Sequence, residues 1–417
     1  MLMSLVHSGR ARVSWADTSL AVGLLISAVG MCVSVPLVYA GYAVAAVGAL
    51  LEPRRLAPFL VGWPWALALS AWMTLCGFFS SFEVSRVPPG WTYCWLALPI
   101  WALAASQPQR LALAMWGFAS GAVLATTLAA LQFFIGYGND VPPWRIDRQG
   151  PKMVKASGFY SHWIRFGDAV AFAALALAAW LYRFRGLALS PIWWRCGVAA
   201  FLALGLAATF ISNARGAFIA FIVGAWVLAA SLLPWRRLGV FTVAMIVILG
   251  LTVALAWPTH GARIQNAMAG RDGRTYIWHT AWETFRQHPL TGVGHRGYDK
   301  GALATVAQGL SEAGPEGADM GNAHNSFLSL LVLYGVPGLF LWSAWLFSVG
   351  REIWGLRHRH PAAGPLLVAT LSIFLVGSLT EDLAAYASSR FQLFFGLAVA
   401  LGCARTVSPA EGELLRR

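Results

Sequence analysis

Charged side chains are scarce in this chain. Asp, Glu, Lys and Arg together make up 11% of the residues, and only 17 residues are acidic. A soluble globular protein carries about a quarter charged residues, so this composition excludes an ordinary soluble protein. Instead, 58% of the residues are hydrophobic, and apolar runs of about 20 residues, long enough to cross a bilayer, recur along the chain. The sequence therefore predicts an all-α polytopic membrane protein, because lipid offers no partners to free backbone groups.

Paired cysteines and metal-ligand motifs are also missing. The cysteines show no CxxC or other paired spacing and lie in or beside apolar runs, which predicts small core residues at Cys32, Cys76, Cys94, Cys196 and Cys403. There is no HExxH and no dense group of Asp, Glu and His. The pair Glu381–Asp382 could hold a cation, although charges that bracket the edge of a span are the commoner explanation. We therefore expect no metal and no cofactor.

Twelve apolar segments are predicted to span the membrane. They cover residues 17–35, 36–51, 57–80, 91–106, 110–136, 164–183, 196–212, 215–234, 238–257, 324–349, 362–380 and 387–404. No cleavable signal peptide is evident, because the first apolar run is long enough to stay in the membrane. The chain thus divides into residues 1–257 with nine spans, a long loop at 258–323, and residues 324–417 with three spans and a tail.

Lysine and arginine set the orientation of the spans. With the N-terminus in the cytoplasm, 16 of the 30 basic residues fall in inner segments, and only Arg86, Arg215 and Arg390 fall in short outer loops. The inverted orientation would reverse this bias. We therefore predict cytoplasmic N- and C-termini, with residues 258–323 on the outer side.

The remaining 11 basic residues lie in two longer outer segments, 137–165 and 258–323. Long loops cross the membrane regardless of charge, so mere tolerance is one explanation. The alternative is a cationic face that collects an anionic substrate. Phosphate suits arginine in particular, because its planar fork can hold two oxygens at once. In the first segment, Lys152, Lys155 and Arg165 are the candidates for substrate binding.

The best-defined element of the long loop is the stretch GRTYIWHTAWETFRQ, which follows a predicted N-cap at Asp272. Helical spacing gives it one apolar face, made of Ile277, Trp278, Ala281, Trp282 and Phe285. Such an amphipathic helix would lie at the membrane surface with its tryptophans among the headgroups. Arg274, one turn before Trp278, could then reach a lipid-linked phosphate. A packed surface helix with a solvated arginine fits the spacing equally well.

A polar pair stands at the mouth of the tenth predicted span. His324 and Asn325 are followed by nine residues, Gly335, two residues and Gly338. This pattern resembles the signature of O-antigen ligases and bacterial O-linked oligosaccharyltransferases, within the superfamily that includes O-antigen polymerases. The stretches GRTYIWHTAWETFRQHPLTGVG and SNARGAF, which contains Arg215, resemble two further segments of that superfamily. The resemblance therefore covers about residues 200–350, and the glycines would permit close helix packing.

The resemblance implies a GT-C-like membrane protein with about twelve transmembrane helices in the bacterial inner membrane. The donor would be a glycan on undecaprenyl diphosphate, presented at the periplasmic face. The acceptor would be a sugar hydroxyl on lipid A-core, and transfer would invert the anomeric carbon. Apart from membrane lipids, no other partner is expected, and no nucleic acid.

The resemblance also implies roles for individual residues. His324 would be the base that takes the hydroxyl proton, since a neutral imidazole is suited to this near pH 7. Arg215 and Arg274 would stabilise the departing diphosphate. Asn325 would orient the imidazole or the substrate, and Trp278 is a further candidate for substrate binding.

Three alternatives remain open from the sequence. An O-antigen polymerase would join two lipid-linked glycans, but the His-Asn-Gly-Gly pattern is of the ligase type. Protein O-oligosaccharyltransferases usually carry a longer C-terminal region than the one that follows the twelfth span here. A transporter is less favoured, because no inverted pair of interrupted helices is evident and few ionisable groups lie at mid-span.

Overall fold

The structure is a computed structural model that describes residues 14–79, 91–135, 147–148, 154–160, 162–182, 191–268, 273–295, 297–309, 322–384 and 386–406. Helices dominate these segments. Within them, the extended structure is one antiparallel pair of two-residue strands, β1 (Asp147–Arg148) and β2 (Val154–Lys155). The protein is an all-α polytopic membrane protein, as its composition predicts.

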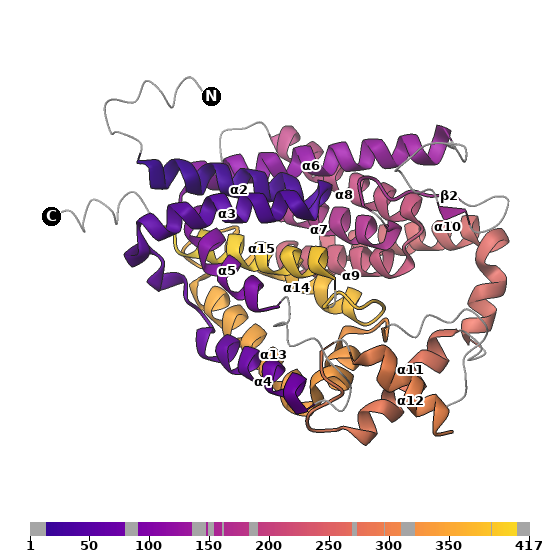
Figure 1. The fold of residues 1–417 in the computed structure, drawn as a ribbon. Helices are drawn as coiled ribbons and strands as arrows, with labels where there is room; N and C mark the ends of the chain where they lie inside the picture. Colours follow the sequence, from indigo (N-terminus) through magenta and orange to yellow (C-terminus); the bar gives the residue numbers. More distant parts are fainter. Residues whose placement is uncertain are drawn as a thin grey trace.

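The helices follow one another as shown in Figure 1. Their bounds are α2 (Trp15–Val33), α3 (Val35–Leu51), the 3-10 turns η1 (Pro53–Arg55) and η2 (Ala57–Phe59), α4 (Trp63–Phe79), α5 (Trp91–Ala105), α6 (Pro108–Ile135), α7 (Trp163–Tyr182), α8 (Pro191–Ser212), α9 (Arg215–Leu232), α10 (Trp235–Met268), α11 (Gly273–Gln287), α12 (Tyr298–Ala307), α13 (Ser326–Leu356), α14 (Ala363–Ser378) and α15 (Ala387–Ala404).

Each predicted span coincides with one of these helices, and α11 and α12 lie between the ninth and the tenth. In the described part of the chain, seven helices are long and apolar enough to cross a membrane. An eighth results if α3 and the following 3-10 turns, bent by 102° at their junction, count as one span. Shorter apolar helices at Cys94–Ala105 and Ala363–Ser378 coincide with two more of the predicted spans.

The ninth helix runs past the boundary predicted for it. The apolar run ends at residue 257, but α10 continues to Met268, because a helical backbone can outlast its apolar side chains. Helix α10 therefore extends 11 residues beyond the predicted end of the ninth span.

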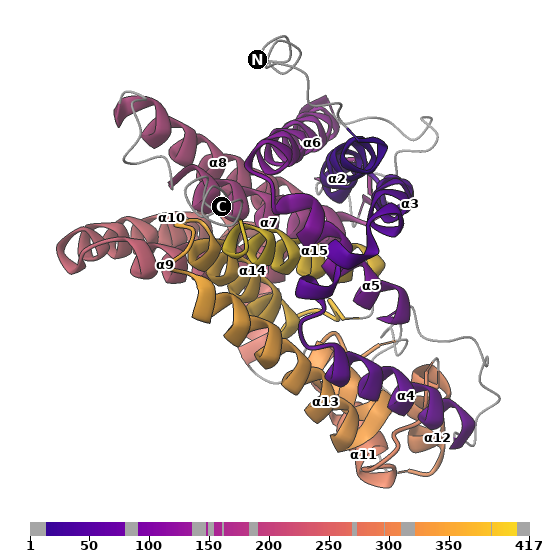
Figure 2. The same cartoon turned by 90° about the vertical axis from the view of Figure 1, so that its left-hand side faces the viewer.

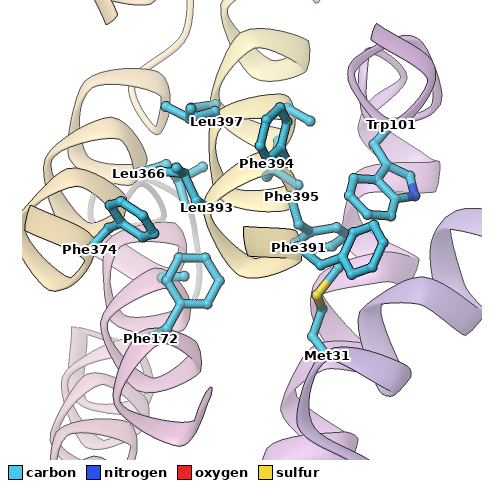
Figure 3. Packing of buried hydrophobic residues seen from close by; sticks show 14 of the residues in the cluster. Met31, Trp101, Phe172, Leu366, Phe374, Phe391, Leu393, Phe394, Phe395 and Leu397 are labelled. Carbon is cyan, nitrogen blue, oxygen red and sulfur yellow. The ribbon is translucent and has the colours of Figure 1, made fainter. Parts of the chain in front are cut away.

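Helix α15 lies at the centre of the bundle (Figures 1 and 2). Of the residues in its span, 89% are buried. Figure 3 shows its aromatic side chains between α5 and α7. The ring of Phe395 lies 5.5 Å from that of Trp101 and 5.7 Å from that of Phe118. Glycines allow close approach, since an added Cβ at Gly402 would lie 2.7 Å from the Ala102 carbonyl oxygen. Such close packing drives helix association in lipid, because the lipid tails are themselves apolar and the hydrophobic effect no longer favours contact between helices.

Helix α13 connects this bundle to the segment that contains α11 and α12. It lies beside α4, and its first half carries α11 and α12 (Figures 1 and 2). The Trp72 indole N–H donates to the Tyr334 carbonyl oxygen at 2.8 Å, which ties α4 to the middle of α13.

Most residues of the short segment 156–160 before α7 are buried, although Phe159 is 38% exposed. Gln132 of α6 accepts from the backbone N–H groups of Ser157 and Gly158 at 3.1 and 3.0 Å. The Tyr160 hydroxyl donates to the Met31 carbonyl oxygen. Burial raises the pKa of Tyr160 well above its usual value, so the phenol stays protonated and can donate.

Candidate active site

Helix α11 packs against α12 and α13 through part of its predicted apolar face. Ile277 and Ala281 are buried, together with Thr280 and Thr284 on the same side. The predicted face also contains two tryptophans, but Trp278 is 39% exposed and Trp282 48% exposed. The helix begins at Gly273, next to the predicted cap Asp272, which lies outside the described residues. One side of α11 is thus buried against the protein, and both tryptophans remain partly exposed.

A break in α13 receives the turn that follows α11. Gly335 has φ 67° and ψ −171°, which frees carbonyls that a continuous helix would use. The N–H groups of Val293 and Gly294 donate to the Val332 and Leu333 carbonyl oxygens at 2.8 and 3.0 Å. An added Cβ at Gly335 would clash with the backbone of Leu290. The sequence predicts helix packing at this glycine, whereas the structure shows a turn docked on it.

His324 lies just before α13 in a left-handed conformation, with φ 46°. Its backbone N–H donates to the side-chain oxygen of Asn322 at 2.8 Å. The Trp278 indole N–H donates to the Ala323 carbonyl oxygen at 2.9 Å, so this tryptophan holds the backbone beside the histidine. Asn325 caps α13 by accepting from two backbone N–H groups at 3.0 and 3.1 Å. These contacts hold the backbone on both sides of His324.

The carboxylate of Glu381 joins His324 to Arg274. Its Oε1 accepts from Nη2 of Arg274 at 2.5 Å, and its Oε2 lies 3.2 Å from Nδ1 of His324. Glu381 is buried, with 3% of its side chain exposed, whereas Arg274 is 36% and His324 19% exposed. The carboxylate therefore lies beneath two groups that reach the surface.

The loop between α14 and α15 holds Glu381 in position. The Ser326 hydroxyl donates to the Glu381 carbonyl oxygen at 3.2 Å and accepts from the Ala384 N–H at 3.1 Å. The Asn325 amide donates to the Leu379 carbonyl oxygen at 3.3 Å. The residues next to His324 thus bind the loop that carries its carboxylate partner.

Arg215 begins α9 next to the same loop. It is exposed, and its neighbour Gly216 lies against Thr380 and Glu381. An added Cβ at Gly216 would lie 3.4 Å from Cγ of Glu381 and would clash with the Thr380 hydroxyl. The glycine thus lets the start of α9 approach Glu381. The positive end of the helix dipole points the same way.

Of the three candidates in the segment 137–165, Arg165 is the one whose side chain the structure describes. The Arg165 guanidinium stacks 4.7 Å from the Tyr386 ring, at the start of α15. Lys155 lies in β2 opposite Asp147, and the position of its side chain is outside what the structure describes. Lys152 lies outside the described residues altogether. Asp168, one turn after Arg165, is buried.

The arrangement is suited to proton transfer beside an anion. If Nδ1–H of His324 donates to Glu381, Nε2 carries the lone pair and can accept a proton from a hydroxyl. Arg274 supplies positive charge on the other oxygen of the same carboxylate, and Arg215 begins the helix whose next residue, Gly216, approaches Glu381. Among the described residues, no three His, Cys, Asp or Glu side chains are grouped as metal ligands.

Glu381 is the functional residue whose role the sequence did not predict. The sequence treats it as one half of an acidic pair at a span edge. The sequence offers one clue, since only 17 of its residues are acidic. A carboxylate at the edge of a span carries a free-energy cost, so such a residue is a candidate for a functional role.

Comparisons with known proteins agree with the motifs. A family model described as O-Antigen ligase matches residues 198–343, a range that contains Arg215, Arg274 and His324. The chain is also similar to a protein of Pseudomonas aeruginosa named "O-antigen ligase". The two are 28% identical over 342 residues, which is 80% of this chain and 75% of that protein. Its motifs, its helical plan and both comparisons thus support a relationship to the O-antigen ligase family.

Proposed function

We propose that the protein is an O-antigen ligase, a glycosyltransferase that moves a glycan from undecaprenyl diphosphate to a sugar hydroxyl of lipid A-core. The family supports glycosyl transfer of the O-antigen ligase type. The observation that carries the mechanism is the contact of Glu381 with both His324 and Arg274. One carboxylate thereby joins a potential base to a potential anion-binding group.

His324 acts as the general base in this proposal. Glu381 accepts from Nδ1–H, fixes the tautomer and stabilises the imidazolium that forms when Nε2 takes the proton. This is the role a carboxylate plays behind a catalytic histidine. The acceptor oxygen then attacks the anomeric carbon from the face opposite the leaving group.

The bonds balance without a further reactant. The acceptor O–H bond breaks and its proton goes to Nε2, while a new C–O bond forms at the anomeric carbon. The bond from that carbon to the diphosphate oxygen breaks, and its electron pair leaves with the lipid diphosphate. Attack from the opposite face inverts the configuration of the carbon.

Arg274 and Arg215 stabilise the leaving diphosphate. Arg274 is oriented by Glu381 through one nitrogen, which leaves other N–H groups of its fork available to phosphate oxygens. Arg215 adds a second guanidinium at the start of α9, where the helix dipole also favours an anion. Because two arginines supply the positive charge, we propose a metal-independent reaction, with Arg165, Lys152 and Lys155 as further contributors to substrate binding.

Trp278 and Asn325 position the base. Trp278 donates to the Ala323 carbonyl oxygen next to His324, and Asn325 caps the helix that follows. Both residues were predicted to bind substrate, and the exposed ring of Trp278 can still line the site. We further propose that the site faces the periplasm in the bacterial inner membrane, with both termini cytoplasmic, because this orientation keeps most arginines inside.

Analysis of lipopolysaccharide from a deletion strain tests the function. A ligase predicts loss of long chains on lipid A-core while the lipid-linked polymer persists. Core molecules capped with one repeat would instead indicate a polymerase, and unchanged lipopolysaccharide with altered glycoproteins would indicate a protein O-oligosaccharyltransferase. Complementation should succeed with the wild-type gene and with Glu283→Gln, and should fail with Glu381→Gln.

A further inference from the structure

A second polar region lies at the opposite end of the bundle from His324. Helix α13 runs from Ser326, beside the candidate active site, to Leu356, and α15 runs in the same sense to Ala404. Between their far ends is an open cavity of about 790 Å³, bordered by the turns after α3 and between α5 and α6. Its lining includes four arginines from four separate segments: Arg55, Arg110, Arg359 and Arg405.

Arg110 is the most buried of the four. It is 6% exposed, and its Nη1 lies 3.6 Å from Oδ1 of Asp17. Its Nε has no hydrogen-bond partner among the described residues. A buried guanidinium nitrogen without a partner is costly. The cavity therefore contains a donor suited to an acceptor that comes from outside the chain.

The carboxylates around the cavity do not balance its arginines. Asp17 and Glu52 both pair with Arg55, at 3.4 and 2.6 Å, and Glu352 pairs with Arg405 at 2.5 Å. Four arginines thus face three carboxylates, which leaves one positive charge. Within the described part of the chain, Arg359 forms no ion pair. The surplus charge and the unpartnered Nε of Arg110 both favour an anion.

The rest of the lining is apolar. Phe59, Leu103 and Leu356 contribute to the wall, and the cavity lies where membrane-spanning helices end. A site with arginines on one side and apolar side chains on the other fits a ligand with a charged head and a hydrocarbon chain. Basic pockets between the ends of transmembrane helices bind lipid headgroups in this way, and the arginine fork matches phosphate oxygens.

We propose that this cavity binds the phosphate headgroup of an anionic membrane lipid, in the leaflet opposite the candidate active site. Arg110 and Arg359 contact the phosphate, Arg405 and Arg55 border it, and the apolar wall receives the first part of an acyl chain. The site is separate from the glycan-transfer residues and does not depend on their assignment. A free phosphate ion shares the headgroup chemistry but leaves the apolar wall uncovered.

Lipid binding to the purified full-length protein tests the proposal. In nanodiscs or by native mass spectrometry, phosphatidylglycerol should bind at least about 10-fold more tightly than phosphatidylcholine. Arg359→Gln should weaken phosphatidylglycerol binding about 10-fold, the effect of one lost charge-assisted hydrogen bond. Because Arg359 is exposed and forms no ion pair in the described structure, this variant should fold. Arg405→Gln should act in the same direction, although it also loses its contact with Glu352.

A matched control is Arg237→Gln, which removes an exposed arginine at the start of α10 that does not line the cavity. It should bind phosphatidylglycerol as the wild type does. Equal affinity for both lipids, or unchanged binding by Arg359→Gln, would overturn the proposal. Displacement of the lipid by millimolar inorganic phosphate or glycerol 3-phosphate would overturn the lipid assignment and identify a soluble phosphate as the ligand.

Discussion

Nδ1 of His324 lies 3.2 Å from Oε2 of Glu381, although 57 positions separate the two residues in the chain. The other carboxylate oxygen binds Arg274 on a third segment. Three elements that are far apart in the sequence therefore meet at one buried carboxylate. They are the segment that contains α11, the start of α13 and the turn before α15. This geometry makes separate predictions for the carboxylate, the imidazole and the arginines.

Replacing Glu381 by Gln should abolish most of the transfer. Gln keeps the shape and the backbone contacts to Ser326, but it cannot stabilise an imidazolium or hold Arg274 by charge. We expect kcat to fall about 10²-fold or more, within the range a general base contributes. Glu283→Gln is the control, since Glu283 pairs with the exposed Arg286 on the same outer segment. A Glu381→Gln protein with the wild-type transfer rate would exclude the dyad.

His324→Asn separates the base from the backbone role of the histidine. Asn is among the residues that best tolerate a left-handed conformation, so the variant should fold although φ is 46° at this position. Transfer should fall by about 10²–10⁴-fold, while the melting temperature stays near that of the wild type. His288→Asn, in the same outer segment, should retain activity. Appreciable turnover by His324→Asn would show that the histidine is structural.

Arg274→Lys and Arg215→Lys test the need for a forked cation. Lysine keeps the charge and can still pair with Glu381, but one ammonium cannot offer two parallel donors to the diphosphate. Each variant should lose about 10–100-fold in kcat/KM, equivalent to one charged hydrogen bond. Arg286→Lys is the control, because Arg286 is 63% exposed and pairs with Glu283 alone in the described structure. Full activity in both test variants would remove the arginines from the mechanism.

The apolar runs predicted the positions of the membrane helices well. Each predicted span coincides with a helix, and α11 follows its predicted cap residue directly. Apolar runs are a local property, so a sequence can report them. Their ends are less certain, and α10 continues through residues that are no longer apolar.

The partners of the site residues could not be predicted in the same way. The contact between Glu381 and His324 depends on how α13, α14 and α15 pack, which no local pattern encodes. Likewise, the pattern identifies Gly335 but not the turn from residues 289–294 that docks against it. The resemblance to the family pointed to His324, Arg215 and Arg274. The carboxylate that connects His324 to Arg274 became visible only in three dimensions.

Membrane orientation can be tested with single cysteines placed by exposure. Lys300 on α12 and His358 after α13 are both exposed, whereas Ala363 is fully buried and would resist labelling. In a Cys196→Ser background, which removes the exposed native thiol, Lys300→Cys should react with an impermeant maleimide in intact cells. His358→Cys should react only after permeabilisation. The reverse pattern would invert the proposed topology.

The last prediction concerns the docked turn at Gly335. Alanine there would have to adopt φ 67°, and its Cβ would clash with the Leu290 carbonyl. A non-glycine residue in a left-handed conformation costs about 1–2 kcal/mol, so Gly335→Ala should lower the melting temperature of the purified protein. It should also lower transfer, because displacing the turn shifts α11 and therefore Arg274 relative to Glu381.

Gly239→Ala is the matched control: nothing lies within 4 Å of an added Cβ there, and alanine in a helix stabilises by roughly 0.5–1 kcal/mol relative to glycine. If Gly335→Ala matches the wild type in both melting temperature and transfer rate, the turn does not position Arg274, and the arginine must be held by Glu381 alone.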